Sequence, residues 1–275
     1  MTMSHADQHR PSVGSCINRR SLPAQVTVSS HPPFTLVLSA GFFGFYAHAG
    51  FLDALVGHGI RPAAIVGCSA GALIAGCYAS GLEPGEIKAL LNELRRQHFW
   101  DPRPGAGLLR GERLHRFLSE TLPIHDMART RIPTRLVAWD VLDRRTLVIQ
   151  HGNLLTAMRA SAAFPFLFRP VRFRGRRLLD GGIGDRSALS GARAGERLLL
   201  HWLVSSSPWR KGDFQRSTPE LPSDSDRIVS LGDFQRLGPF RMQAGMAVYD
   251  EARERTLRWL ENNEAQLDAW LAASR

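Results

Sequence analysis

The sequence is poor in cysteine. It contains three cysteines in 275 residues, and this small, odd number argues against the disulfide framework typical of small secreted proteins. Two of them, Cys68 and Cys77, lie in apolar stretches, where a thiol usually packs as a small hydrophobic group, and the third is Cys16. The sequence therefore predicts buried free thiols at positions 68 and 77 and no disulfide framework.

Long apolar runs are also missing. No stretch approaches the roughly 18 to 20 consecutive apolar residues that a membrane-spanning helix needs. The N-terminal region lacks the apolar core of a Sec signal peptide, because charged residues such as Asp7, Arg10 and Arg19 are interspersed among Ser, His and Pro. Residues 1–33 are therefore predicted to form a flexible polar N-terminal tail, and a cytoplasmic location is expected.

The charge of the chain is strongly one-sided. Thirty-five Lys and Arg residues against 25 Asp and Glu give a formal net charge of +10, which attracts polyanions. No long Lys/Arg block, zinc-finger spacing or aromatic-basic RNA-binding motif accompanies this excess, which argues against nucleic acid as the partner. The positive charge therefore favours peripheral association with an anionic membrane. The sequence identifies no protein partner.

The sequence does contain an alternation of short apolar runs and helical patterns, bounded by glycine and proline. Such an alternation is typical of a mainly parallel sheet with helices on both faces. We therefore predict a three-layer α/β/α fold with a mainly parallel central sheet, in one domain over residues 34–275. Predicted strands are 34–38, 63–66, 135–140, 145–149 and 197–205, with a hairpin at 172–179 and a surface loop at 208–227. Predicted helices are 46–58, 70–80, 86–97, 112–122, 154–162 and 246–270, the last within a C-terminal helical appendage at about 240–275.

A Gly-x-Ser-x-Gly pattern lies between a predicted strand and a predicted helix, as Gly67-Cys68-Ser69-Ala70-Gly71. A serine on such a sharp turn has strained backbone angles, and glycines at the flanking positions prevent collisions with the neighbouring strand and helix. The turn exposes the hydroxyl at a helix N-terminus, where partial positive charge favours a developing oxyanion. The pattern alone is short enough to arise by chance, but its place between a strand and a helix predicts that Ser69 is a nucleophile.

A nucleophilic serine needs a base, and the histidines after position 150 are poor candidates. His201 lies inside an apolar strand, as a core histidine would, and His151 precedes a glycine in a turn. In contrast, Asp180 follows an apolar strand and precedes Gly181 and Gly182, which allow a tight turn that brings the carboxylate close to another loop. Desolvation in an apolar cleft would raise the pKa of this carboxyl group and improve it as a proton acceptor. Asp180 is therefore predicted to be the base.

These motifs together resemble the patatin-like phospholipase family, and the resemblance extends over residues 34–205 in the right order. It rests on the segments 67–71 and 180–182, and also on His48-Ala49-Gly50-Phe51-Leu52 and on Arg159-Ala160-Ser161-Ala162-Ala163-Phe164-Pro165. Members of the family use a Ser-Asp dyad, which the resemblance places at Ser69 and Asp180. It also implies a structural role for Asp185.

The resemblance further implies an oxyanion hole in the glycine-bearing loop after the first strand. The family commonly has Gly-Gly-Gly-x-Arg/Lys-Gly there, whereas this sequence has Gly41, Phe42, Phe43 and Gly44, closer to the Gly-Phe-Leu-Gly loop of triglyceride-lipase-like members. Backbone N–H groups of these four residues are the predicted donors, and Gly41 and Gly44 are expected to adopt the backbone angles that turn these groups toward one point. The aromatic residues around them form either an apolar mouth for an acyl chain or part of the core. An arginine cluster before Asp180 is either a phosphate-binding group or a solvated face, and comprises Arg169, Arg172, Arg174, Arg176 and Arg177.

The sequence thus predicts a serine lipid acyl hydrolase of the phospholipase A or esterase type. Its reaction would proceed through an acyl-enzyme intermediate, and neither a metal nor another cofactor is implied, since no cluster of His, Cys or carboxylate residues has ligand spacing. Neutral glycerides, simple esters and thioesters are alternative substrates. A different alternative is a catalytically idle domain that binds lipid or a protein partner, which the altered glycine loop would favour.

Overall fold

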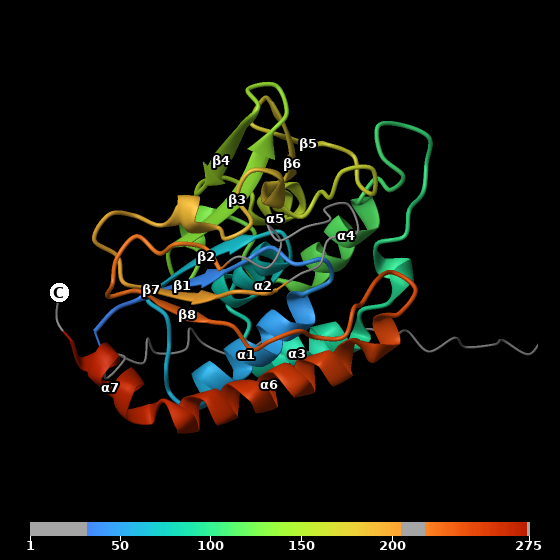
Figure 1. Cartoon of the computed structure of the whole chain (residues 1–275). Coiled ribbons are helices and arrows are strands. Elements are labelled where there is room, and N and C mark those ends of the chain that lie inside the picture. Colours follow the sequence, from blue (N-terminus) through green and yellow to red (C-terminus); the bar gives the residue numbers. More distant parts are fainter. Residues whose placement is uncertain (1–31, 205–217, 274–275) are drawn as a thin grey trace, which may run out of the picture.

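The computed structural model of the chain describes residues 32–204 and 218–273 and has a mixed eight-stranded sheet at its centre (Figure 1). The strand order is β5-β6-β3-β2-β1-β7-β8, with β4 pairing to the other edge of β3. Five strands are mutually parallel, namely β3, β2, β1, β7 and β8, while β4, β5 and β6 are antiparallel to their neighbours. The predicted α/β fold with a mainly parallel sheet is confirmed. The strands are β1 Thr35–Leu38, β2 Ala64–Cys68, β3 Thr134–Asp140, β4 Arg145–Ile149, β5 Val171–Phe173, β6 Arg176–Asp180, β7 Leu198–His201 and β8 Arg227–Val229.

The α-helices gather on one face of the sheet. They are α1 Phe45–Gly57, α2 Ala70–Ala79, α3 Pro84–Glu93, α4 Glu112–Thr121, α5 Leu154–Ser161, α6 Gly245–Asn262 and α7 Glu264–Ala272. In β1 the alternation of side chains directs Leu36 and Leu38 toward these helices, and α6 runs along the outer side of α1 (Figure 1). Cys77 of α2 is a buried free thiol on this side, as predicted.

The opposite face of the sheet has a shorter cover. Val37, Val66 and Val137 point to this side and pack with Ala188 and its neighbours around the short 3-10 turn η4 Leu189–Gly191. Cys68 is a buried free thiol here, which also matches the prediction. Helical cover on the two faces is therefore unequal in the described residues: α-helices cover one face and a 3-10 turn with its flanking loop covers the other.

Several boundaries differ from the predictions for local reasons. The predicted helix 246–270 is broken at Asn263, whose φ of −123° and ψ of 14° separate α6 from α7. The predicted helix 86–97 ends at Glu93 and is followed by the 3-10 turn η1 Arg96–His98. Strand β8 was not predicted, and its first residue is the last residue of the predicted loop. Three residues are too few for a periodic signal. Residues 1–31 of the predicted tail and 208–217 of the predicted loop lie outside the described residues.

One glycine of α1 lets α6 pack against it. A Cβ on Gly50 would lie 2.2 Å from the carbonyl oxygen of Tyr249, whereas a Cβ on Gly57, at the other end of α1, would meet nothing within 4 Å. We expect Gly50→Ala to push α6 away and lower the free energy of unfolding by about 1 to 3 kcal/mol, as overpacking does. The matched control Gly57→Ala should leave it unchanged or raise it by about 0.5 kcal/mol. Urea unfolding of both variants checks this, and equal stabilities would contradict it.

None of the helices within residues 32–204 and 218–273 is both long enough and apolar enough to cross a bilayer.

Candidate active site

Two strand ends meet on one edge of β3. β2 runs parallel to β3, and its last residue, Cys68, pairs with Val137. β6 runs antiparallel to β3, and its last residue, Asp180, pairs with Ala138, the next position along β3. Since β4 occupies the other edge of β3 at these positions, β2 and β6 approach the same edge from opposite directions. Ser69, which follows β2, is thereby brought to Asp180 across 111 residues of sequence.

The turn after β2 holds Ser69 in a conformation that few residues other than glycine adopt, with φ 54° and ψ −116°. The two flanking positions have no room for a side chain, so both must be glycine. A Cβ on Gly67 would lie 2.6 Å from the carbonyl oxygen of Gly71, and a Cβ on Gly71 would lie 2.2 Å from the carbonyl oxygen of Leu38. Helix α2 begins at Ala70, so the Ser69 hydroxyl stands at a helix N-terminus, where partial positive charge favours a developing oxyanion. This is the strand-turn-helix geometry that presents a serine for attack.

The side chains of Ser69 and Asp180 are hydrogen-bonded. Ser69 Oγ donates to Asp180 Oδ2 at 2.6 Å, and the backbone N–H of Gly182 donates to Asp180 Oδ1 at 2.8 Å. Asp180 is only 4% exposed, and this burial raises the pKa of its carboxyl group to about 6, although the two hydrogen bonds act in the opposite direction. A carboxylate that is short of solvation and in contact with a hydroxyl is a suitable proton acceptor for it.

Gly181 allows the turn after Asp180 to lie directly against β3. This turn is the 3-10 turn η3 Gly181–Ile183. A Cβ on Gly181 would lie 2.2 Å from the carbonyl oxygen of Val137 and 2.8 Å from Cys68 Sγ. The first glycine of the Asp-Gly-Gly segment is therefore required by close approach to the end of β2, and the second supplies the N–H that binds the carboxylate.

Ser161 is a further polar residue at this junction, and its contact was not predicted from the sequence. It is fully buried at the last position of α5. Its Oγ accepts the backbone N–H of Ser69 at 2.9 Å and donates to the carbonyl oxygen of Val137 at 2.5 Å. One hydroxyl thus ties α5, β3 and the turn of Ser69 together. No local pattern marks the contact, because 92 residues separate Ser161 from Ser69.

Replacing Ser161 with alanine should affect both stability and rate. The Ser69 N–H would lose the acceptor that the described residues provide, so we expect the free energy of unfolding to fall by about 1 to 3 kcal/mol. A less constrained Ser69 turn should also lower kcat by about tenfold. Urea unfolding and hydrolysis of a soluble ester measure the two effects. Ser119→Ala, at a half-buried position of α4, is the matched control. A Ser161→Ala protein as stable and as fast as this control would contradict the assignment.

The loop after β1 begins beside the carboxylate. A Cβ on Gly182 would lie 3.2 Å from Ala40 Cβ, which places the start of the loop next to the Asp180 turn. The N–H of Gly44 donates to the carbonyl oxygen of Gly41 at 2.9 Å, so this predicted oxyanion donor is already engaged. The N–H groups at positions 41, 42 and 43 donate to no acceptor among the described residues. Three of the four predicted donors thus have a free N–H within the described residues, and the oxyanion role of the loop stays a prediction.

The conformation of this loop also differs from the expectation. The left-handed residue is Phe43, with φ 55°, and not a glycine. The glycines serve close packing, because a Cβ on Gly41 would lie 2.9 Å and a Cβ on Gly44 2.4 Å from Leu203 Cδ1.

The predicted aromatic mouth is divided between surface and core. Phe42 is 36% exposed, and its ring centroid lies 5.4 Å from that of Phe164. Phe164 follows Ala163, whose carbonyl oxygen accepts the N–H of Asp180 at 3.0 Å, so this ring pair lies near the candidate base. Phe166 is 79% exposed. The more deeply buried aromatic residues of the set, Phe45 and Tyr46, belong to the core on the helical face.

Within the described residues, the two histidines after position 150 are separate from the Ser69–Asp180 pair. His201 is fully buried in β7, and its ring stacks on that of Phe51 with the centroids 4.0 Å apart. Its Nδ1 is hydrogen-bonded to Nδ1 of His48 at 2.9 Å. Burial lowers the pKa of His48 to about 4 and that of His201 well below its usual value. His201 is thus a core histidine, as the sequence indicated, and His151 is an exposed turn residue.

The arginines before Asp180 do not form one cluster. Arg176 pairs with Asp140 and Asp143 at 2.5 Å in each case, and Arg169 donates to the carbonyl oxygen of Arg103 at 2.9 Å. The others of the group are exposed, namely Arg172, Arg174 and Arg177.

Asp185 holds the local backbone in place. Its carboxylate accepts hydrogen bonds from the Ser187 hydroxyl and from the backbone N–H groups of residues 188 and 190, at 2.6 to 2.9 Å.

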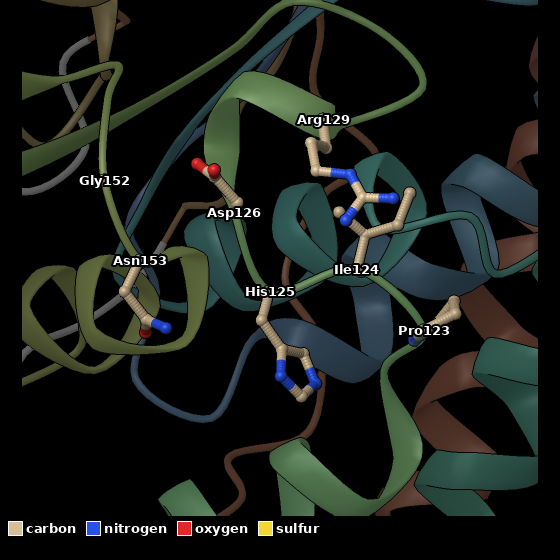
Figure 2. A pocket seen from close by; sticks show the side chains of 7 residues that line it. All are labelled: Pro123, Ile124, His125, Asp126, Arg129, Gly152 and Asn153. Atoms are coloured by element: carbon tan, nitrogen blue, oxygen red, sulfur yellow. The ribbon is translucent and has the colours of Figure 1, made fainter.

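A pocket of about 520 Å³ lies elsewhere, at the start of α5 (Figure 2). Its polar side chains have local partners. His125 Nε2 contacts the carbonyl oxygen of Leu122 at 2.9 Å, Asp126 accepts the N–H of Ala128 at 3.0 Å, and Asn153 caps α5. These capping contacts give the pocket no convergent reactive group. The described residues also contain no group of three or more His, Cys, Asp or Glu side chains placed to hold a metal ion.

The chain is similar to several known proteins. The family model of patatin-like phospholipases matches residues 36–192. Proteins of Mycobacterium bovis and Mycobacterium tuberculosis described as uncharacterized NTE family proteins are 34% identical over 168 residues, which is 59% of this chain and 47% of theirs. The chain thus spans about half the length of these curated relatives.

A solved structure shows the same fold. VipD from Legionella pneumophila is similar with a TM-score of 0.59 and 14% identity, over 84% of this chain and 67% of VipD. ExoU in its complex with SpcU from Pseudomonas aeruginosa aligns with a TM-score of 0.48 and 15% identity, over 90% of this chain and 53% of that one. Because the family model spans more than half of the 275 residues and includes the turns of Ser69 and Asp180, the chain belongs to the patatin-like phospholipase family.

Proposed function

We propose that this protein hydrolyses carboxylic esters of lipids, with Ser69 as nucleophile and Asp180 as general base. The observation that carries the proposal is the 2.6 Å hydrogen bond from Ser69 Oγ to Asp180 Oδ2, formed by a strained serine at a helix N-terminus and a buried carboxylate. Membership of the patatin-like phospholipase family supports lipid esters as the substrate class.

The chemistry takes two steps. Asp180 Oδ2 takes the proton as Ser69 Oγ attacks the ester carbonyl carbon, and a tetrahedral oxyanion forms. The oxyanion collapses, the bond to the alcohol breaks, and protonated Asp180 returns the proton to the leaving alkoxide. Water then attacks the acyl-Ser69 ester, with Asp180 again accepting a proton and returning it to Ser69. The Gly182 N–H keeps Oδ1 occupied, so Oδ2 is the oxygen that faces the hydroxyl.

Backbone N–H groups stabilise the oxyanion in this proposal. Those of residues 41, 42 and 43 have no acceptor among the described residues, and their loop starts beside the Asp180 turn. Each fixed donor of this kind typically stabilises the transition state by about 3 to 4 kcal/mol. The exposed Phe42 and its partner Phe164 provide an apolar surface near the base, which suits the acyl part of a lipid.

The raised pKa of Asp180 predicts the acid limb of the pH-rate profile. The carboxyl group must be ionised to accept a proton, and burial places its pKa at about 6 in the free protein. We therefore expect kcat/KM on a soluble ester to fall tenfold per pH unit below about pH 6 and to be flat from there to neutral pH. Initial rates between pH 4 and 8 check this. A profile whose acid limb lies near pH 4 would show that Asp180 has an ordinary pKa or is not the base.

Two measurements test the function directly. A fluorophosphonate probe should label the wild-type protein at Ser69, identified by mass spectrometry of the modified peptide, because only an activated serine reacts. Incubation with a mixture of phospholipids, glycerides and simple esters should release fatty acid, with the products identified by mass spectrometry. Absence of both labelling and turnover would favour the alternative, a catalytically idle domain that binds lipid or a protein.

A further inference from the structure

A second pocket is formed by three segments that are distant in sequence. It has a volume of about 630 Å³ and lies between the start of α1, the end of α3 with η1, and the segment that leads into α6. Figure 1 shows α1, α3 and α6 running alongside one another in this part of the molecule. The lining contains Arg95 and Arg96 but no Asp or Glu, and Leu91, Met242 and Met246 provide its apolar part.

The positive charges of the two arginines are not paired with carboxylates in the described part of the chain. Neither forms an ion pair with a carboxylate among the described residues, and the adjacent Glu93 does not line the pocket. Arg95 uses Nη1 on the carbonyl oxygens of Asn92 and Leu94, while Arg96 donates no side-chain hydrogen bond within the described part of the chain. Since a guanidinium has five N–H donors in a planar fork, most of these donors are available for an anion.

Aromatic rings hold one of these arginines at the rim. The Arg96 guanidinium carbon lies 5.4 Å from the ring centroid of Trp100 and 5.2 Å from that of Phe240, and the two rings are 5.6 Å apart in an edge-on arrangement. These cation–π contacts restrict the side chain before any ligand binds. Phe240 is 65% exposed, although it is a large apolar residue. Aromatic residues beside basic ones at a surface are typical of the boundary between water and lipid.

We propose that this pocket binds the phosphate of an anionic phospholipid in a bilayer surface. Arg95 and Arg96 bind the phosphate, Phe240 enters the headgroup layer, and Leu91 with the two methionines contacts the first part of an acyl chain. The apolar part and the exposed ring favour a lipid over a free phosphate, which has no apolar group to contact them. Tyr46 also lines the pocket and lies in the first turn of α1, directly after the loop 41–44, so the docked bilayer would face the mouth of the candidate active site.

The inference deepens the proposed function by naming how the protein meets its lipid surface, and its test does not need turnover. Full-length Ser69→Ala protein is sedimented with vesicles of phosphatidylcholine alone and with vesicles that contain phosphatidylglycerol as well. We expect binding to the anionic vesicles only. Adding Arg95→Gln and Arg96→Gln should weaken it by about tenfold or more, since each basic residue near an anionic surface contributes about 1 kcal/mol.

Two further variants separate a built site from diffuse charge. Arg172→Gln with Arg177→Gln removes the same charge from exposed positions on the β5–β6 hairpin, and it should weaken binding by less than about threefold. Arg95→Lys with Arg96→Lys keeps the charge but loses the planar fork, and it should still weaken binding by about threefold or more. Circular dichroism melting of each variant verifies folding. Equal losses in the two glutamine pairs, full binding by the lysine pair, or equal binding to neutral vesicles would overturn the proposal.

Discussion

Replacing Ser69 with alanine is expected to reduce ester hydrolysis by about a thousandfold or more, to the rate that binding and the oxyanion donors alone can support. The Ser69 hydroxyl is the group of the candidate site that would form the acyl-enzyme, because it contacts Asp180, whereas the Ser161 hydroxyl is fully buried and bonded to backbone groups. The same substitution should abolish labelling by a fluorophosphonate probe. Steady-state rates on a soluble p-nitrophenyl ester and on phospholipid measure the loss.

The control for this variant is a serine that lies outside the site. Ser119→Ala removes a half-buried hydroxyl of α4 that donates to the carbonyl oxygen of Arg116 in the same helix, and it should keep the wild-type rate. The Ser69→Ala protein should also remain folded, because the turn is held by the glycines at 67 and 71 and by the Ser161 contact to the Ser69 N–H, none of which needs the Ser69 hydroxyl. Undiminished hydrolysis by folded Ser69→Ala protein would place the nucleophile elsewhere.

The candidate residues were predictable from sequence, and their pairing was predicted from the need of Ser69 for a base and from the resemblance, not from a local signal of their contact. Gly67, Ser69 and Gly71 form a local pattern because the steric demands of the turn act between near neighbours. Nothing local indicates that Asp180 lies opposite Ser69. That follows from the register of β3, on which Cys68 and Asp180 pair with consecutive residues. Such pairing joins segments far apart in sequence and leaves no periodic signal.

The groups that sequence reasoning missed share this non-local origin. Ser161 reads as one small polar residue in a helix, and its contact with Ser69 exists only because α5 packs beside β3 and α2. The pocket of Arg95 and Arg96 requires η1 to lie beside the segment before α6, some 145 residues later. In the oxyanion loop the error was different. The glycines were expected to supply unusual backbone angles, yet Leu203 of another segment packs on them, and Phe43 takes the left-handed conformation.

Replacing Asp180 with asparagine should remove activity and stabilise the fold at the same time. Asparagine can still accept the Gly182 N–H through Oδ1, but it cannot take the proton of Ser69 Oγ, so kcat/KM should fall by about a thousandfold or more. Burial raises the pKa of Asp180 from 3.8 to about 6 on folding. The folded state therefore binds more protons than the unfolded state between these values, and the free energy of unfolding falls as the pH rises from about 4 to 6.

Above pH 6 the wild-type protein bears the full cost of burying the charge, on the order of 3 kcal/mol from the shift in pKa. The neutral asparagine avoids this cost, so Asp180→Asn should gain stability over the wild type at pH 8 and lose that advantage at pH 4. Urea unfolding at both pH values measures the difference, and Asp268→Asn, at an exposed position of α7, should show no such pH-dependent gain. A stability gap that is the same at pH 4 and 8 would mean that Asp180 is not a buried, destabilised carboxylate. If the gap follows the pH as expected while hydrolysis is lost, the free energy spent on burying the charge is what makes this carboxylate a base near neutral pH.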